Sequence, residues 1–331
     1  MLIKITLPKT VMLRHLLYFA LLLGAILLSL ATTACKLNPT PPNRYALVYG
    51  VSEYDPNISY NGYHFSSLEY TDNDAVDMDA ALREKGYSVQ LRIDADATKE
   101  QFKEDLSHYA QNLSKNDILL IFFSGHGTQS YPTDWDISND EDHFSDVYDE
   151  YLVFYQEDTY YKNHTISDTD LYSLINKLPN RKVVLIIDVC FSGGFIGQYS
   201  DVDAISPDYQ YDDQLRDNIF ASTLKSFFNP SQADITPDAA IVLTASGERE
   251  TSAEPKVGVD KDPLNVKNGF FTESILHAFN NSDRNHDGYI DTLELYNGAR
   301  DYFAYLSKSY YLDYMPHISG GPVDYILFKA D

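Results

Sequence analysis

The chain has 331 residues, of which 44% are apolar and 14% aromatic, so it can bury a full hydrophobic core. Acidic residues outnumber basic ones 49 to 25, which gives a formal net charge of −24 spread along the sequence. A surface of this sign repels a phosphate backbone, so we do not expect nucleic-acid binding. It favours divalent cations or basic polypeptides instead, although acidity can also serve solubility alone.

The N-terminus has the pattern of an export signal. Three basic residues within the first 14 positions precede an uncharged run from Leu16 to Ala31, and small residues then lead to Cys35. This arrangement resembles a bacterial lipoprotein signal, in which residues 1–34 are removed and Cys35 carries the lipid. The alternative is an uncleaved anchor, because the run is only slightly shorter than the roughly 20 residues that span a bilayer. Both readings predict an exported protein held at a membrane of the bacterial cell envelope, and neither says which membrane.

Residues 35–43 contain three prolines and no apolar periodicity, which predicts a stiff tether to a folded domain at 44–331. The chain has only two cysteines, Cys35 and Cys190. If Cys35 is lipidated, Cys190 has no partner for an intramolecular disulfide. A lone thiol in an exported protein is unusual enough to need an explanation.

Apolar runs rich in β-branched and aromatic residues alternate with helical patterns. Strands are predicted at 45–51, 87–93, 117–124, 182–190 and 239–245, and helices at 73–85, 98–113 and 167–178. Near-continuous hydrophobicity suits strands that are buried on both faces, so we expect an α/β fold with a mostly parallel central sheet. Short strands at 151–155 and 325–328 have no predicted place in it, and the polar stretches 193–238 and 246–268 fit no regular element.

Two predicted strands that follow one another along the chain end in residues that can carry out nucleophilic catalysis if the strands are neighbours in the sheet. His126 follows the third strand, and Cys190 ends the fourth. Since the carboxyl ends of parallel strands meet at one edge of a sheet, the imidazole could take the thiol proton and later give it to a leaving amine. The backbone N–H groups of Gly127 and Cys190 could stabilise the oxyanion. Taken singly, each residue could instead be a buried thiol or a satisfied polar group.

Two motifs at these strand ends, SGHG at 124–127 and DVCFSG at 188–193, resemble the His and Cys motifs of the caspase-like peptidases, and the bacterial metacaspase branch most closely. Weaker matches are NDA at 73–75, YDEYL at 148–152 and TSAE at 251–254. The resemblance covers most of residues 44–331. It implies a caspase-like fold, a catalytic dyad of His126 and Cys190, polypeptide substrates and no organic cofactor.

The resemblance also bears on which bond is cut. Asp188 lies two residues before Cys190, so strand alternation points both to the same side. Asp74 matches the second wall of an acidic pocket in metacaspases, and paired carboxylates would hold a substrate Arg or Lys. The alternative for Asp74 is a carboxylate that interacts with a helix N-terminus. An Asp-specific caspase would need a basic pocket, and Arg249 lies among glutamates instead.

Residues 283–294 match an EF-hand loop at every ligand position, with Gly288 at the sharp turn. The expected calcium ligands are Asp283, Asn285, Asp287, the Tyr289 carbonyl, Asp291 and Glu294. The alternative is an acidic connector between two helices that binds no ion. Separately, the resemblance implies an activating calcium ion near the active site, and Asp149 and Asp168 match two of its positions.

The main hypothesis is therefore a cysteine endopeptidase that cuts after Arg or Lys, with calcium as a candidate requirement. Such an enzyme could process itself in the long polar segment, at Arg216 or Lys225. The alternative from another class is a catalytically silent caspase-fold lipoprotein that binds calcium or a partner at the envelope. The sequence does not identify the natural substrate.

Overall fold

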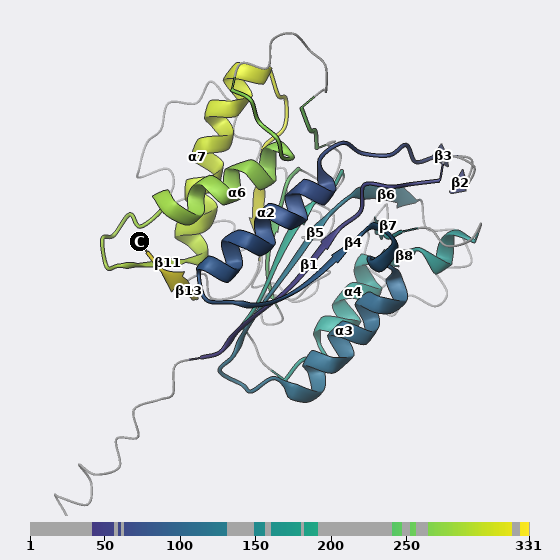
Figure 1. Cartoon of the computed structure of the whole chain (residues 1–331), viewed down its shortest axis with the longest axis horizontal. Helices are drawn as coiled ribbons and strands as arrows, with labels where there is room; N and C mark the ends of the chain where they lie inside the picture. The colour runs from purple at the N-terminus through teal and green to yellow at the C-terminus, as the bar shows by residue number, and fades with distance from the viewer. Residues whose placement is uncertain are drawn as a thin grey trace, which may run out of the picture. The chain divides into compact units, whose positions relative to one another are not determined.

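The computed structural model describes residues 42–55, 59–60, 63–130, 149–155, 160–179, 182–190, 240–246, 252–255, 264–319 and 325–330 (Figure 1). The chain divides into two units, Met1–Pro42 and Asn43–Asp331, and only the second is treated below. The predicted signal, Cys35 and most of the tether lie outside the described residues, as do Arg216 and Lys225. Within the described part, none of the helices combines the length and apolar character needed to cross a bilayer.

A mostly parallel sheet forms the centre of this unit, which confirms the predicted fold class. Its order is β12-β10-β9-β5-β1-β4, and only β12 runs antiparallel to its neighbour. The strands are β1 Arg44–Gly50, β4 Ser88–Ile93, β5 Ile118–Ser124, β9 Val183–Asp188, β10 Ile241–Thr244 and β12 His317–Ser319. The predicted strands thus form, and β12 is an addition that the sequence did not indicate.

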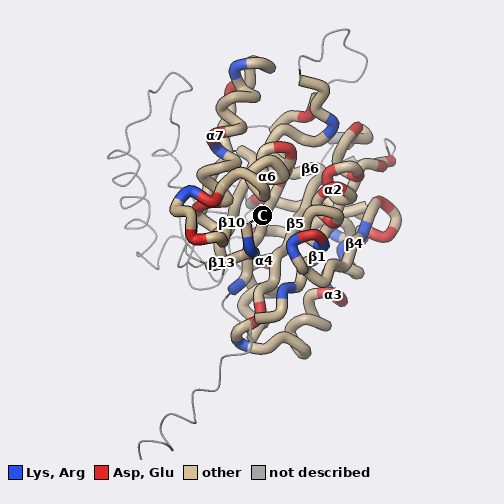
Figure 2. Tube along the Cα trace, turned by 60° about the vertical axis from the view of Figure 1, so that its left-hand side comes forward, with Lys and Arg blue, Asp and Glu red and all other residues tan. Residues whose placement is uncertain are grey.

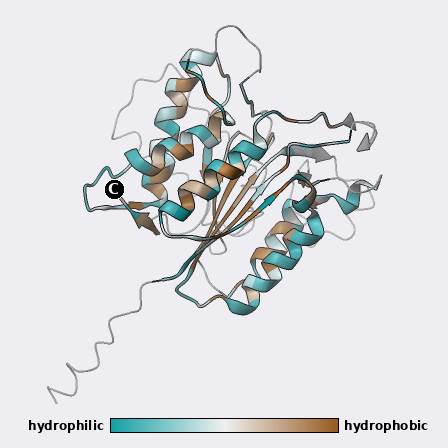
Figure 3. Cartoon of the chain, in the orientation of Figure 1, coloured by the Kyte–Doolittle hydropathy of each residue, from teal (hydrophilic) through white to brown (hydrophobic). Residues whose placement is uncertain are grey.

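Helices cover both faces of the sheet, because alternate residues of each strand point to opposite sides. Ala46 and Val48 face a core shared with α2, α6 and α7, whereas Leu47 and Tyr49 face a core shared with α3 and α4. The helices are α2 Thr71–Glu84, α3 Lys99–Asn112, α4 Asp168–Ile175, α6 Phe270–Asn281 and α7 Thr292–Tyr310. Figure 3 shows the apolar strands between helices whose polar faces turn outward.

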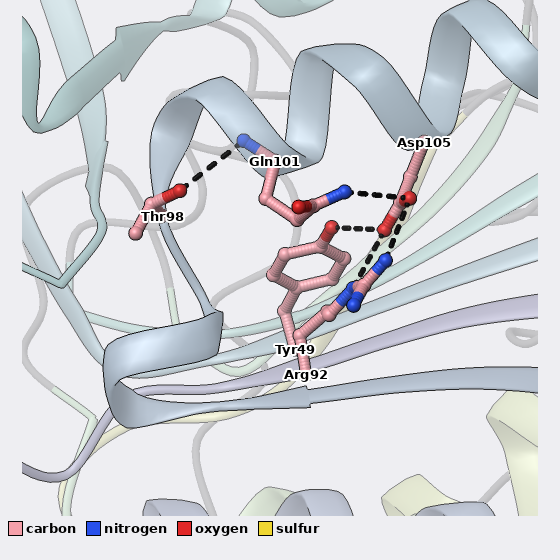
Figure 4. Close-up of polar contacts among 5 residues, drawn as sticks. All are labelled: Tyr49, Arg92, Thr98, Gln101 and Asp105. Atoms are coloured by element: carbon pink, nitrogen blue, oxygen red, sulfur yellow. Dashed lines mark hydrogen bonds and ion pairs between the residues drawn. The ribbon is translucent and has the colours of Figure 1, made fainter.

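Polar contacts fasten α3 across the ends of β1 and β4 (Figure 4). The Thr98 side chain caps the helix by accepting from the Gln101 N–H. Asp105 accepts from the Tyr49 hydroxyl at 2.6 Å and from Arg92 through two nitrogens, each at 3.0 Å. Burial alone would raise the pKa of Asp105, but these donors, with Gln101, lower it. The network therefore joins three elements through one ionised carboxylate.

Three small sheets complete the described fold. Strands β6 His126–Ser130, β7 Asp149–Val153 and β8 Thr165–Ser167 form one antiparallel sheet, β11 Tyr289–Asp291 pairs with β13 Ile326–Lys329, and β2 Ser59–Tyr60 pairs with β3 Tyr63–His64. The two short strands that the sequence left unplaced, β7 and β13, therefore lie outside the central sheet. Short 3-10 turns, η1 Asp94–Asp96 and η2 Tyr161–Asn163, lie in connections.

Candidate active site

Two adjacent strands bring the His126 and Cys190 segments together at the carboxyl edge of the sheet. Strands β5 and β9 pair in register, with Ser124 opposite Asp188. The chain continues for two residues beyond this pair to reach His126 on one side and Cys190 on the other. Gly127 lies so close to the second segment that a β-carbon added to it would come 2.1 Å from the Cys190 carbonyl oxygen. Only glycine fits there without a shift of the backbone.

The His126 ring is held in a defined orientation by residues from the loops that follow β1. The backbone N–H of His126 donates to the Tyr54 hydroxyl at 3.0 Å, and that hydroxyl donates to the Val153 carbonyl. The ring packs against Tyr54 and Phe65, with centroid distances of 4.6 and 4.9 Å. Nε2 lies 2.8 Å from the Ser66 carbonyl oxygen, which can only accept, so Nε2 carries a proton. In the neutral ring, Nδ1 is then the free acceptor.

Burial shifts both groups toward their uncharged forms. It lowers the pKa of His126, against the opposing effect of the Ser66 carbonyl. It raises the pKa of Cys190. The Cys190 thiol donates to the Ser252 carbonyl at 3.7 Å, and this contact opposes part of the rise in pKa. Burial therefore favours a neutral thiol and a neutral imidazole over an ion pair of the two. A thiol in this state needs a base at the moment of attack.

Two buried carboxylates lie on either side of Gly269. Asp74, on α2, is fully buried and accepts from the Ser124 hydroxyl at 2.7 Å and from the Gly269 N–H at 2.8 Å. Asp188 is 5% exposed and accepts from the Thr272 N–H at 3.1 Å and hydroxyl at 2.7 Å. A β-carbon at Gly269 would lie 2.7 Å from one Asp188 oxygen and 3.1 Å from one Asp74 oxygen.

The two carboxylates affect each other's ionisation. Burial, followed by the negative charge of Asp188, raises the pKa of Asp74. Burial also raises the pKa of Asp188 to about 6; the Thr272 donors oppose that shift and Glu254 adds to it. All the hydrogen-bond donors that the described residues supply to the pair are neutral. A cation entering between them would relieve the repulsion.

The segment 252–255 links the thiol to the surrounding helices. Ser252 accepts from the Cys190 thiol, and the Glu254 carboxylate accepts from the N–H groups of Glu69 and Tyr70 just before α2. The Tyr314 hydroxyl accepts from the Ala253 N–H at 2.9 Å. Figure 2 shows acidic residues at many separate places along the described unit.

The remaining predicted metal ligands lie elsewhere. Asp149 begins β7, and Asp168 follows directly after β8, which pairs with β7, so their backbones lie near one edge of that small sheet. Asp168 is 3% exposed, and the Asp149 side chain lies outside the description. The loop 283–294 connects α6 to α7. In the described part of the chain, no group of three or more His, Cys, Asp or Glu side chains is gathered closely enough to hold a metal ion.

Several residues around the site carried no sequence signal. Tyr54, Phe65 and Ser66 lie in loops without a motif, and Ser66 acts through its backbone. Gly269 and Thr272 begin an ordinary amphipathic helix. The only available signal is that a glycine and a hydroxyl residue at a helix N-terminus can donate to a carboxylate.

Comparisons with known proteins identify the family to which the chain belongs. The family model described as "Caspase domain" matches residues 43–322. The crystal structure of a Geobacter sulfurreducens protein aligns with a TM-score of 0.54 at 20% identity, covering 87% of this chain and 97% of that chain. Caspase-1 from Spodoptera frugiperda aligns with a TM-score of 0.48 at 12% identity, covering 88% and 92%. Among curated proteins, none matches the chain significantly.

Proposed function

Because the chain belongs to the caspase-domain family, we propose that it is a cysteine endopeptidase whose catalytic dyad is His126 and Cys190. One observation carries this proposal more than any other. The two segments meet at adjacent strand ends, with Gly127 packed against the Cys190 backbone, while the Ser66 carbonyl fixes the imidazole tautomer. This arrangement leaves Nδ1 of His126 as the base for the thiol.

The reaction follows from these protonation states. As the Cys190 sulfur attacks the carbonyl carbon of the scissile peptide bond, Nδ1 of His126 takes the thiol proton. The N–H groups of Gly127 and Cys190 stabilise the oxyanion. The imidazolium then gives its proton to the leaving amine, and a thioester remains on Cys190. Water, with His126 again as base, hydrolyses the thioester and restores the thiol.

We place Asp74 and Asp188 in the pocket for the substrate residue before the scissile bond. Two neighbouring carboxylates with only neutral donors around them favour a cationic side chain. An arginine guanidinium presents five donors, enough to bind both carboxylates at once, and a lysine ammonium presents three. The substrates would therefore be polypeptides cut after Arg or Lys.

The N-terminal pattern supports a place at the cell envelope. In this proposal the chain is exported and held at a membrane through a lipid on Cys35. From the family resemblance we also propose that a calcium ion binds near the active site, with Asp149 and Asp168 among its ligands. Fractionating cells that express wild type or Cys35→Ala tests the anchor: the variant should leave the membrane fraction, and its retention there would favour an uncleaved signal helix.

Hydrolysis of a peptide library tests the activity. Wild type should cleave peptides with Arg or Lys before the scissile bond and ignore those with Asp. Cys190→Ala and His126→Ala should each lose turnover, whereas Cys35→Ala, which removes the only other cysteine, should retain it. A folded wild-type protein without turnover on any peptide would favour the catalytically silent alternative. Turnover by a folded Cys190→Ala protein would show that Cys190 is not the nucleophile.

A further inference from the structure

The loop between α6 and α7 folds so that its side-chain oxygens turn back onto its own backbone. The Asp283 carboxylate accepts from the Gly288 N–H at 3.1 Å, Asn285 accepts from the Asp287 N–H at 2.8 Å, and Asp287 accepts from the Tyr289 N–H at 2.9 Å. The sharp turn is made by Gly288 with φ +82°. The acceptors at loop positions one, three and five therefore face the backbone of the loop itself.

One of these acceptors is buried without a partner. Of the two Asp283 carboxylate oxygens, Oδ2 accepts the Gly288 N–H across the loop, whereas Oδ1 is shielded from solvent and accepts no hydrogen bond. Leaving a buried carboxylate oxygen unsatisfied is costly, because the group has lost its water without gaining a donor. A cation bound in the loop would supply the missing partner for Oδ1.

The last acidic residue of the loop reaches back over its beginning. Glu294 is 7% exposed, and its carboxylate accepts from the N–H groups of Arg284 at 3.1 Å and Asn285 at 3.2 Å. It is held there by a capping box with Asp291 at the start of α7. Position twelve is thus folded toward position one, although the carboxylates are not gathered at coordinating distances. An ion would have to draw them closer together.

Strand β13 pairs with the part of this loop that forms β11. Ile290 pairs with Phe328 in the β11–β13 ladder, and both side chains are buried. The Ala330 N–H donates to the Gly288 carbonyl, and the Thr292 N–H donates to the Tyr325 carbonyl. The loop is therefore part of the packed unit, joined to α6, α7 and β13.

We propose that this loop binds one calcium ion. The ligands are Asp283, Asn285, Asp287, the Tyr289 carbonyl, Asp291 and Glu294, all of them oxygen donors, as calcium prefers. The ion fastens α6, α7 and β13 together, and its role is structural. Since Gly269 is the N-cap of α6 and Thr272 lies in its first turn, the ion supports the frame of the acidic pocket from the opposite end of that helix. The site does not depend on the proposed peptidase activity.

Calcium titration of the full chain, carrying Cys190→Ala to prevent self-cleavage, tests this directly. Calorimetry should find a saturable calcium site that belongs to this loop in the parent protein and in Asp96→Asn, a control that removes an exposed carboxylate in η1. Glu294→Gln should bind at least tenfold more weakly. Because Glu294 also caps α7, Asp283→Asn serves as a second variant: its amide oxygen can still accept from Gly288, but it loses a charged ligand.

Hydrogen exchange locates the ion and supplies a readout independent of catalysis. Calcium should raise the melting temperature and increase protection in peptides that cover 283–294 and 325–330, in the parent and in Asp96→Asn but not in the two loop variants. Calcium isotherms that are identical in the parent, Glu294→Gln and Asp283→Asn would overturn the proposal. So would a parent protein that binds no calcium at millimolar concentration, or calcium-induced protection confined to the region of Asp149 and Asp168.

Discussion

Asp74 and Asp188 approach one glycine, Gly269, from helix α2 and strand β9, and both are buried. Their described partners are the neutral donors Ser124, Gly269, Asn268 and Thr272. Ionising both groups in such a place costs stability, because burial raises the pKa of each and the charge of Asp188 raises that of Asp74 further. The same arrangement favours a cationic side chain, which would neutralise both. Stability and specificity are thus linked through one pair of residues.

Replacing Asp188 should therefore stabilise the protein in a pH-dependent way. Burial raises the pKa of Asp188 to about 6, above the roughly 3.9 of an unfolded Asp, so ionising it costs stability as the pH rises through 6. Asp188→Asn, whose amide oxygen can still accept from Thr272, should raise the melting temperature at pH 8 by about 2–4 °C, the shift for roughly 1 kcal/mol in a domain of this size. At pH 4 the gain should vanish. A variant that is less stable at pH 8 would contradict the repulsion.

Activity should fall in acid through two separate effects. Because burial lowers the pKa of His126, loss of the base should have its midpoint below the ordinary 6.5. Protonation of Asp188 near pH 6, with Asp74, Glu254 and Tyr314 also facing this region, should raise KM for Arg substrates. Steady-state kinetics from pH 5 to 8 separate kcat from KM. The pH profile of iodoacetamide alkylation reports the ionisation of Cys190 and His126 independently of the pocket. A constant KM over this pH range would argue against carboxylates in the pocket.

Gly127 should tolerate no side chain. A β-carbon there would lie 2.1 Å from the Cys190 carbonyl, so Gly127→Ala must displace one strand end against the other. Misplacement of catalytic groups by about 1 Å can cost about 100-fold in rate. We expect a loss of at least that size in kcat/KM. The control is Gly86→Asn, at a turn with φ +85° and open space around it, where Asn is acceptable. Equal activity of the two variants would contradict the close approach.

The contacts of Asp105 should contribute to stability but not to specificity. Tyr49→Phe removes the 2.6 Å hydroxyl contact to this carboxylate and should lower the free energy of unfolding by about 1 kcal/mol, the usual net value of a hydrogen bond. Arg83→Ala, which breaks an exposed pair with Asp79 on α2, should change it by less than about 0.5 kcal/mol. Urea denaturation of both variants provides the comparison. Equal losses would mean that the network on β1 and β4 is no stronger than a surface pair.

The sequence predicted those parts of the fold whose residues carry a strong local signal. Strands β5 and β9 are continuous apolar runs because both faces are buried, and their ends carry the His126 and Cys190 motifs. Strand β12 was missed because it is an antiparallel edge strand of only three residues, His317–Ser319, without alternation. Strand β8, Thr165–Ser167, is equally short.

The surroundings of the site were not predictable for a different reason. Tyr54 and Ser66 orient His126 through a hydroxyl and a backbone carbonyl, and neither contact leaves a periodic pattern in the sequence. Gly269 and Thr272 meet Asp74 and Asp188 only after α6 packs beside α2. Such contacts depend on tertiary structure, which local residue patterns do not encode.

Covalent labelling tests the central claim most directly. A peptide probe with Arg at the residue before a thiol-reactive group should modify wild type and Cys35→Ala once per chain, at Cys190, as read by intact-mass and peptide mass spectrometry. A matched probe with Asp in place of Arg should react far more slowly, and Asp74→Asn should reduce the preference for Arg. Labelling of Cys190 by both probes at equal rates would contradict the acidic pocket. A folded wild-type protein that neither probe labels would contradict the peptidase itself.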